Sequence, residues 1–201
     1  MEKGFTLAEV LITLVIIGVI AAMTIPSLIN KTNEQDTVVG VKKAYSVLSQ
    51  AYQRIVADEG EIIPTTLGET GREASTKLGE MFVKQLNVQK VCGTDVINGD
   101  CFSTANGGMY KFFDGTDRTV INTQWGNDYK MVLADGMSVA IRGQTSYQNY
   151  GSSEPLQNII GWVNVDINGE KGPNVTGKDL FNFYITKYGI LPFGTAEDNT
   201  Y

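Results

Sequence analysis

The stretch that decides the fold runs from residue 5 to residue 29 and reads FTLAEVLITLVIIGVIAAMTIPSLI. Its 25 positions hold one charged residue, Glu9. As an α-helix the stretch would be about 37 Å long, which is enough to cross the hydrocarbon core of a bilayer. A cleaved secretory signal has a shorter apolar core, of about 7 to 15 residues. We therefore predict a membrane-spanning helix over residues 5–29, with a plain uncleaved signal anchor as the alternative.

The acid inside this apolar run argues against a plain anchor. An ionised side chain costs about 2.5 to 3.5 kcal/mol at the centre of a membrane helix, and less near its ends. A residue that carries this cost is a candidate for a specific function, and Glu9 is the one such residue between positions 5 and 29.

The residues around Glu9 resemble a known signal. The string KGFTLAEVL at residues 3–11, followed by the long apolar helix, closely resembles the N-terminus of type IV prepilins and type II secretion pseudopilins. The resemblance implies that residues 1–4 are a leader peptide, which a membrane prepilin peptidase cuts off between Gly4 and Phe5. It also implies that the new amino group of Phe5 is methylated. During assembly, Glu9 would pair with the amino group of a neighbouring Phe5, because a buried carboxylate without a cation is costly.

Two residues in the apolar run weaken the helix. Pro26 has no N–H to donate to the carbonyl four residues earlier, so it should kink or loosen the helix, and Gly18 should loosen it further. By the resemblance, part of this helix melts when the subunit leaves the bilayer for the fibre. A proline tolerated in an ordinary membrane helix is the alternative.

Residues 30–57 continue the helix in amphipathic form. Apolar residues recur there at steps of three and four, which is the pattern of a helix with one buried face. These residues are Val38, Val41, Tyr45, Leu48, Tyr52 and Ile55, widened by Ala44 and Ala51. We predict one helix from about Phe5 to Ala57, stopped at Gly60, whose second half packs on a head formed by residues 58–201. A coiled-coil partner on the same stripe is the alternative.

The sequence of the head, residues 58–201, predicts both helix and sheet. Residues 72–88 have helical spacing of apolar side chains, and a loop is expected around Pro64. Several runs rich in aromatic and β-branched residues predict strands. They are residues 109–113, 119–125, 129–133, 138–142, 159–167, 181–186 and 189–193. The polar stretch 143–155 is expected to be a mobile loop. The prediction is an α+β, pilin-like fold, in which a long N-terminal helix packs on an antiparallel sheet.

The two cysteines indicate the compartment. Cys92 and Cys101 lie close together in a stretch rich in Gly, Asp and Asn, with a spacing unlike that of redox or zinc motifs. A disulfide between them would close a loop of about ten residues and stabilise the head by roughly 2.5 to 3 kcal/mol. Disulfides persist in oxidising compartments, which places the head in the periplasm or outside the cell. Two free buried thiols are the alternative.

Composition excludes several functions. The chain contains no histidine, which removes the commonest general base and zinc ligand and every Ser-His or Cys-His nucleophile arrangement. The net charge of −6 argues against nucleic-acid binding, which needs clustered Lys and Arg. Asp114, Asp117 and Asp135 could form a glycosidase-like carboxylate pair, but surface turns explain them better. We therefore expect no enzymatic activity.

One loop near the C-terminus is a candidate calcium site. Residues 166–179 read DINGEKGPNVTGKD and concentrate oxygen-bearing side chains among glycines. Asp166, Asn168, Asn174 and Asp179 could supply side-chain oxygens to Ca²⁺, with backbone carbonyls completing the shell. The glutamate that an EF-hand requires at its twelfth position is missing, so the loop is not an EF-hand. The alternative is a set of Asx turns, in which Asn and Asp bond their own backbone. By residue type alone, the loop resembles the calcium-binding loops of major pseudopilins.

These features predict a structural subunit that polymerises into a type IV pilus (fimbrium) or a type II secretion pseudopilus. Its partners would be other pilin-like subunits, identical or different, together with prepilin peptidase and an inner-membrane assembly platform. The precursor would cross the inner membrane once, with its head on the periplasmic or extracellular side. The alternative is a membrane-anchored periplasmic binding module that never polymerises. Pilus and pseudopilus subunits share this N-terminus, so the signal separates neither the two machines nor major from minor subunits.

Overall fold

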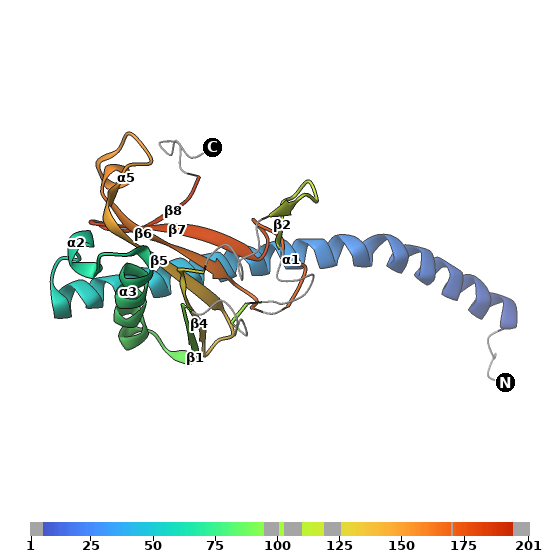
Figure 1. The fold of residues 1–201 in the computed structure, drawn as a ribbon. Helices are drawn as coiled ribbons and strands as arrows, with labels where there is room; N and C mark the ends of the chain where they lie inside the picture. The colour runs from blue at the N-terminus through green and yellow to red at the C-terminus, as the bar shows by residue number, and fades with distance from the viewer. Residues whose placement is uncertain (1–5, 95–100, 103–109, 119–125, 170, 195–201) are drawn as a thin grey trace. The chain divides into compact units, whose positions relative to one another are not determined.

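The structure is a computed structural model that describes residues 6–94, 101–102, 110–118, 126–169 and 171–194 (Figure 1). Two compact units make up the chain, Met1–Val39 and Gly40–Tyr201, and the helix α1 (Leu7–Glu59) contributes to both. The other helices are α2 (Pro64–Leu67), α3 (Gly71–Gln85) and α5 (Glu154–Gln157). The strands are β1 (Val88–Gly93), β2 (Tyr110–Lys111), β3 (Asp117–Arg118), β4 (Tyr129–Leu133), β5 (Ser138–Gln148), β6 (Ile159–Asp166), β7 (Leu180–Thr186) and β8 (Gly189–Pro192).

The predicted long helix is confirmed. α1 runs without interruption through Gly18 and Pro26 and ends beside Gly60, which has a positive φ of 84°. The backbone N–H of Gly60 donates to the carbonyl of Val56 at 3.0 Å, so the glycine takes the left-handed conformation that commonly closes a helix.

Six strands form one antiparallel sheet in the order β1-β4-β5-β6-β7-β8, and β2 and β3 pair in a separate hairpin. Together with the long helix, this sheet confirms the predicted α+β, pilin-like class. One face of the sheet, the helix face, packs with the Gly40–Glu59 part of α1 and with α3 in a single hydrophobic core. From the strands this core takes Met131, Leu133, Val139, Ile141, Val163, Val165, Phe183 and Ile185, and from the helices Ala44, Leu48, Ala51, Ile55, Ala74, Leu78 and Phe82.

The buried stripe of α1 differs from the predicted one at two positions. Val38 and Tyr45 are 51% and 42% exposed, whereas Ala44 and Ala51 are fully buried. Small residues at the centre of the stripe let the helix approach the sheet closely, and the larger Tyr45 ring lies beside this contact, 6.3 Å from the ring of Phe183.

The head contains more strand than the local pattern predicts. The stretch 143–155 was expected to be a mobile loop, but residues 143–148 continue β5 and residues 154–157 form α5, so this prediction is wrong. Gly143 and Gln148 pair with Gly161 and Ile159 of β6 across an irregularity in the register, and the local residues do not indicate this pairing. Residue 88 begins β1 instead of ending a helix, and Pro64 begins α2 where a loop was expected. In the described part of the predicted strand 109–113, Tyr110–Lys111 is a strand and residues 112–113 are not, whereas Met109 and residues 119–125 lie outside the described residues.

The predicted disulfide is present between Cys92 and Cys101. Cys101 is fully buried in a second, smaller core with Phe102, Tyr110, Ala140 and Leu180. Ala140 and Leu180 belong to the sheet face opposite the helix face. The disulfide therefore joins the edge strand β1 to the segment at residues 101–102, which packs on this second face of the sheet. The bond helps to keep that face covered.

Candidate functional site

Glu9 takes part in a reciprocal set of hydrogen bonds at the start of α1. The backbone N–H and the hydroxyl of Thr6 both donate to Glu9 Oε2 at 2.8 Å, and the backbone N–H of Glu9 donates to Thr6 Oγ1 at 3.3 Å. This pattern is a capping box, in which each side chain satisfies a backbone donor that has no partner within the helix. Sequence analysis missed the role of Thr6, although the spacing Thr-x-x-Glu at residues 6–9 is its recognised signal.

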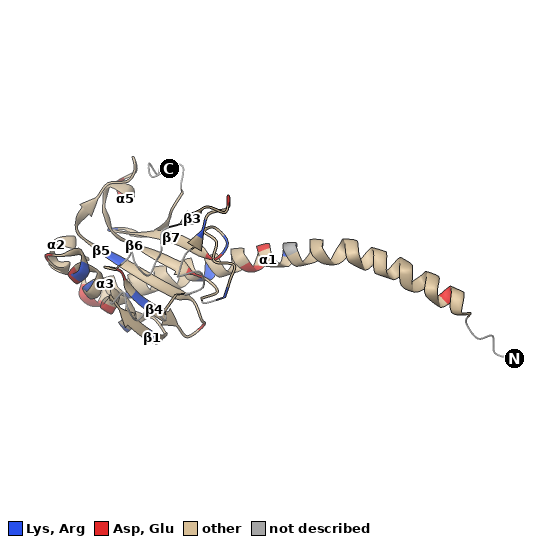
Figure 2. Ribbon diagram, turned by 45° about the vertical axis from the view of Figure 1, so that its right-hand side comes forward, with Lys and Arg blue, Asp and Glu red and all other residues tan. Residues whose placement is uncertain are grey.

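The segment that follows is apolar on every side. Its most apolar window has a mean hydropathy of 2.5, and none of that window is buried within the protein. Among the described residues, α1 is the one helix long and apolar enough to cross a membrane. Figure 2 shows a single acidic position near the start of this helix, followed by a long stretch without charge. Such an all-round apolar surface needs lipid or another apolar partner to cover it.

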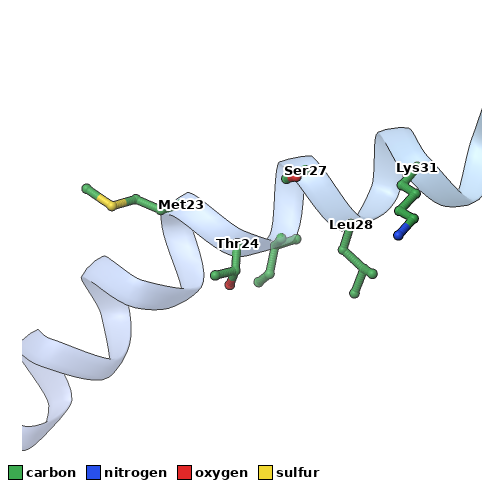
Figure 3. A pocket seen from close by; sticks show the side chains of 6 residues that line it. Met23, Thr24, Ser27, Leu28 and Lys31 are labelled. Atoms are coloured by element: carbon green, nitrogen blue, oxygen red, sulfur yellow. The ribbon is translucent and has the colours of Figure 1, made fainter.

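The helix satisfies the hydroxyls of two threonines in this segment. Thr13 Oγ1 donates to the carbonyl of Val10 at 2.9 Å, and Thr24 Oγ1 donates to the carbonyl of Ile20 at 2.9 Å. Bonds of this kind leave few hydroxyls unsatisfied in lipid. Beside Pro26, a shallow groove is lined by Met23, Thr24, Ile25, Ser27, Leu28 and Lys31 (Figure 3). The helix α1 is unbroken at Gly18 and Pro26. The loosening expected at these two residues therefore stays a prediction.

The candidate calcium loop joins β6 to β7, and three of its four predicted ligands are connected by hydrogen bonds. Asp166 Oδ1 accepts from the backbone N–H groups of Asn168 and Gly169 at 3.1 and 2.9 Å. Asn168 Nδ2 donates to Asp179 Oδ1 at 2.8 Å, and Asp179 Oδ2 accepts from the backbone N–H of Val175 at 2.9 Å.

The fourth predicted ligand is buried in the same loop. Asn174 has a left-handed backbone with φ of 58°, and its carbonyl oxygen accepts from the backbone N–H of Lys111 in β2 at 2.9 Å. The loop is thereby tied to the β2–β3 hairpin. Tyr110, also in β2, makes a second connection, because its hydroxyl donates to Asp166 Oδ2.

Burial governs the electrostatics of the loop. It raises the pKa of Asp166 to about 7, and the hydrogen bonds from Tyr110, Asn168 and Gly169 offset the effect only in part. The nearby charge of Asp179 raises this pKa further. Because the folded-state pKa lies above that of the unfolded chain, the contribution of Asp166 to stability falls as the pH rises from about 4 through 7. A bound cation would reverse this by favouring the ionised form.

Comparison with protein families identifies the N-terminal segment. Residues 1–25 match the family model described as the prokaryotic N-terminal methylation motif. The chain carries a prepilin-type signal. This motif is the signature of type IV pilins and pseudopilins, and it confirms the resemblance drawn from residues 3–11. A search of curated proteins and a search of solved structures each found no match to the chain.

The prepilin-type motif covers most of the residues predicted to act in processing and assembly. Gly4 and Phe5 lie within the match but outside the described residues, so cleavage and methylation there stay predictions. Glu9 lies within the match and in the first turn of α1. Two of the carboxylates considered for catalysis make contacts close to their own turns or strands. Asp114 accepts from Thr116 within one turn, and Asp135 forms an ion pair with Lys43 at 2.8 Å.

The loop of this prepilin-type chain has the donor chemistry that calcium prefers. Its side-chain ligands are all oxygens, and Asn168 Oδ1 is buried without a hydrogen-bond partner among the described residues. Yet the carboxylate oxygens of Asp166 and Asp179 already accept hydrogen bonds from within the loop or from Tyr110, which is what the Asx-turn alternative requires. A measurement separates the two interpretations.

If the loop binds calcium, the metal should stabilise the head. At a calcium concentration about a hundred times the dissociation constant, the gain is about 2.7 kcal/mol. For a chain of this size, that raises the Tm by roughly 5 to 10 °C. Thermal unfolding at pH 8, with calcium and with a chelator, measures the difference. Asp179→Asn should abolish it, and Asp114→Asn, outside the loop, should retain it. An equal Tm in calcium and in chelator would leave the loop as a set of Asx turns.

Proposed function

We propose that this chain is the precursor of a structural subunit that polymerises into a pilus or pseudopilus. A prepilin peptidase removes residues 1–4, Phe5 is then methylated, and residues 5–29 hold the subunit in the inner membrane until it is assembled. The observation that carries this proposal is the placement of Glu9, an ionisable residue in the first turn of an otherwise apolar helix that matches the methylation motif.

Assembly follows from the physical properties of that helix. Its apolar surface is covered by lipid before assembly and needs equivalent cover in a fibre, which the same segment of neighbouring subunits can provide. Apolar packing alone fixes no register along a helix. The charge of Glu9 does so, because the subunit that places the methylated amino group of its Phe5 at the carboxylate is favoured over every other alignment.

The head supports export to an oxidising compartment. The disulfide between Cys92 and Cys101 is stable there and would be reduced in the cytosol. The alternative is a tethered periplasmic binding module that never polymerises. The presence of Glu9 disfavours that alternative, since a tether gains nothing from a charge in its apolar segment. Recovery of the chain in filaments sheared from intact cells would exclude the tether.

Mass spectrometry of the mature N-terminus tests the processing step. In cells with prepilin peptidase, the chain should begin at Phe5 and carry one added methyl group, whereas in cells without the enzyme it should keep Met1. Gly4→Leu should block cleavage, because a branched side chain hinders the extended backbone in the protease cleft. Gly18→Leu places the same side chain 14 positions downstream, in open space, and should be processed normally. An intact Met1 in the presence of the peptidase would refute the proposal.

A further inference from the structure

The β2–β3 hairpin presents two adjacent aromatic side chains to solvent. Phe112 and Phe113 form its tip and are 45% and 71% exposed. Figure 1 shows the hairpin standing out from the six-stranded sheet. Neighbouring exposed phenylalanines are uncommon on a small head, because each leaves apolar area in water that burial elsewhere would remove.

The tip is held firmly in place. The backbone N–H of Phe112 donates to the carbonyl of Thr116 at 2.9 Å, and Gly115 closes the turn with a positive φ of 82°. The one acid in the turn, Asp114, accepts from the backbone N–H and the hydroxyl of Thr116 at 2.8 and 2.6 Å. The two exposed rings therefore belong to a hydrogen-bonded turn.

The hairpin rests on the loop between β6 and β7. Lys111 exchanges backbone hydrogen bonds with this loop, accepting from Thr176 N–H at 2.8 Å and donating to the carbonyl of Asn174. Phe113 lies against Gly177, where a Cβ would come within 2.5 Å of the ring. The amino group of Lys178 is 5.8 Å from the centroid of the same ring. Lys111 and Lys178 are exposed, so two basic side chains lie beside the aromatic tip.

This loop lies at the end of the head that the chain enters from the apolar segment. Ile167 packs on Gly40, the first residue of the head unit, where a Cβ would come within 2.9 Å of Ile167 Cδ1. The backbone N–H of Ile167 donates to the carbonyl of Asp179 at 2.9 Å, close to Gly177 and Lys178. Gly40 follows Ile29, the end of the apolar run, by 11 positions in the chain. The aromatic tip therefore belongs to the end of the head at which the chain enters it.

We propose that, in the membrane-anchored subunit, the tip of the β2–β3 hairpin docks on the lipid surface. Phe112 and Phe113 enter the interfacial region, and Lys111 and Lys178 lie against anionic headgroups. Aromatic rings favour this interface, and basic side chains near it are attracted to anionic lipid. The inference rests on the proposed function, since it requires residues 5–29 to be in the bilayer. Docking would restrict how the head swings about the short helical connection before assembly.

Spin-label accessibility in vesicles tests this docking in the full chain. The chain has two cysteines, both in the disulfide, so an introduced cysteine is the one free thiol for a nitroxide. Three variants are compared: Phe113→Cys at the tip, Met23→Cys in the apolar segment and Tyr188→Cys as the matched control. Tyr188 is an exposed head aromatic, 52% accessible, in a turn whose Lys187 carbonyl accepts from Tyr52, 12 residues further along α1 than Gly40.

Oxygen concentrates in lipid and a neutral, water-soluble nickel chelate in water, so the ratio of the two accessibilities reports depth. At Phe113 the ratio should be several-fold higher than at Tyr188, and it should rise when phosphatidylglycerol is added to phosphatidylcholine. The combined Lys111→Gln and Lys178→Gln variant should lose most of that rise. A persistent rise in this variant would refute the role of these lysines.

The outcomes separate this proposal from the proposed function. A water-like ratio at Met23 would mean that the apolar segment is not in the bilayer, and both would fail. A lipid-like ratio at Met23, with equal water-like ratios at Phe113 and Tyr188, would overturn the docking proposal alone. Spectral broadening at Phe113 that disappears when labelled protein is diluted with unlabelled protein would assign the tip to a second copy of the chain and also overturn it.

Discussion

Replacing Glu9 by glutamine should abolish fibre formation while leaving the head folded. Removing one partner of a buried ion pair costs about 3 to 5 kcal/mol, because the other charge is left without compensation. At about 1.4 kcal/mol per factor of ten, the affinity at each subunit contact should fall by a factor of a hundred or more. In a polymer each subunit makes this contact, so the loss recurs at every step of growth and few fibres should form.

Glutamine is the informative substitution because it changes the charge alone. A capping box accepts glutamine as well as glutamate at this position, so the bonds with Thr6 and the start of α1 should survive. Glu34→Gln is the matched control, since Glu34 is an exposed acid on the same helix, beyond the apolar run. The measurement is the amount of subunit in the sheared filament fraction relative to the membrane fraction. Wild-type amounts of filament with Glu9→Gln would refute the assembly role of the charge.

Replacing Gly143 by alanine should destabilise the head strongly, because α3 lies directly on this residue of β5. A Cβ at Gly143 would be 2.5 Å from both the carbonyl carbon and the oxygen of Ala74, and 2.9 Å from the backbone nitrogen of Ser75. These are backbone atoms of the hydrogen-bonded helix α3, near its start, so they cannot move aside singly. The backbone N–H of Gly143 also donates to Ser75 Oγ at 3.1 Å, and a displaced helix would lose that bond.

The expected cost of Gly143→Ala is about 3 kcal/mol, at the upper end for overpacking by one methyl group. For a chain of this size, the Tm should fall by roughly 6 to 12 °C. Gly71→Ala is the matched control, because Gly71 begins the same helix and a Cβ there meets only Asn127 Nδ2 at 3.9 Å. That variant should be neutral or slightly stabilised. Thermal unfolding followed by circular dichroism measures both, and an unchanged Tm for Gly143→Ala would contradict the packing described.

The features predicted well from sequence are those that local physics determines. α1 was predictable because its apolar run, its amphipathic continuation and the glycine at position 60 all indicate the same helix. The polar end of β5 was not, because Gly143 and Gln148 at its two ends pair with the distant strand β6, which local residues do not reveal. The misplacement of Tyr45 has a similar cause. A spacing rule counts apolar residues by position, whereas the sheet selects small side chains where the helix comes closest.

The candidate site shows the same division. Glu9 could be identified from the sequence because a charge in an apolar run is conspicuous. The disulfide could be predicted because two cysteines allow one pairing. The grouping of Asp166, Asn168 and Asp179 was anticipated from residue type, but which atoms bond was not, since that depends on how the chain turns between β6 and β7. The connection from this loop to Tyr110 spans 56 residues and has no local signal.

The hydrogen bonds between Thr6 and Glu9 have a consequence for the lifetime of a fibre. A solitary subunit already gives its carboxylate two donors, so detachment from a neighbour does not strand a bare anion in the bilayer. In a fibre of the proposed kind, pairing with a neighbouring Phe5 would replace these donors instead of creating an interaction from nothing, and the net gain per subunit would be smaller than the strength of the ion pair suggests. We therefore expect a subunit to leave the end of such a fibre at a smaller cost than an isolated ion pair would impose.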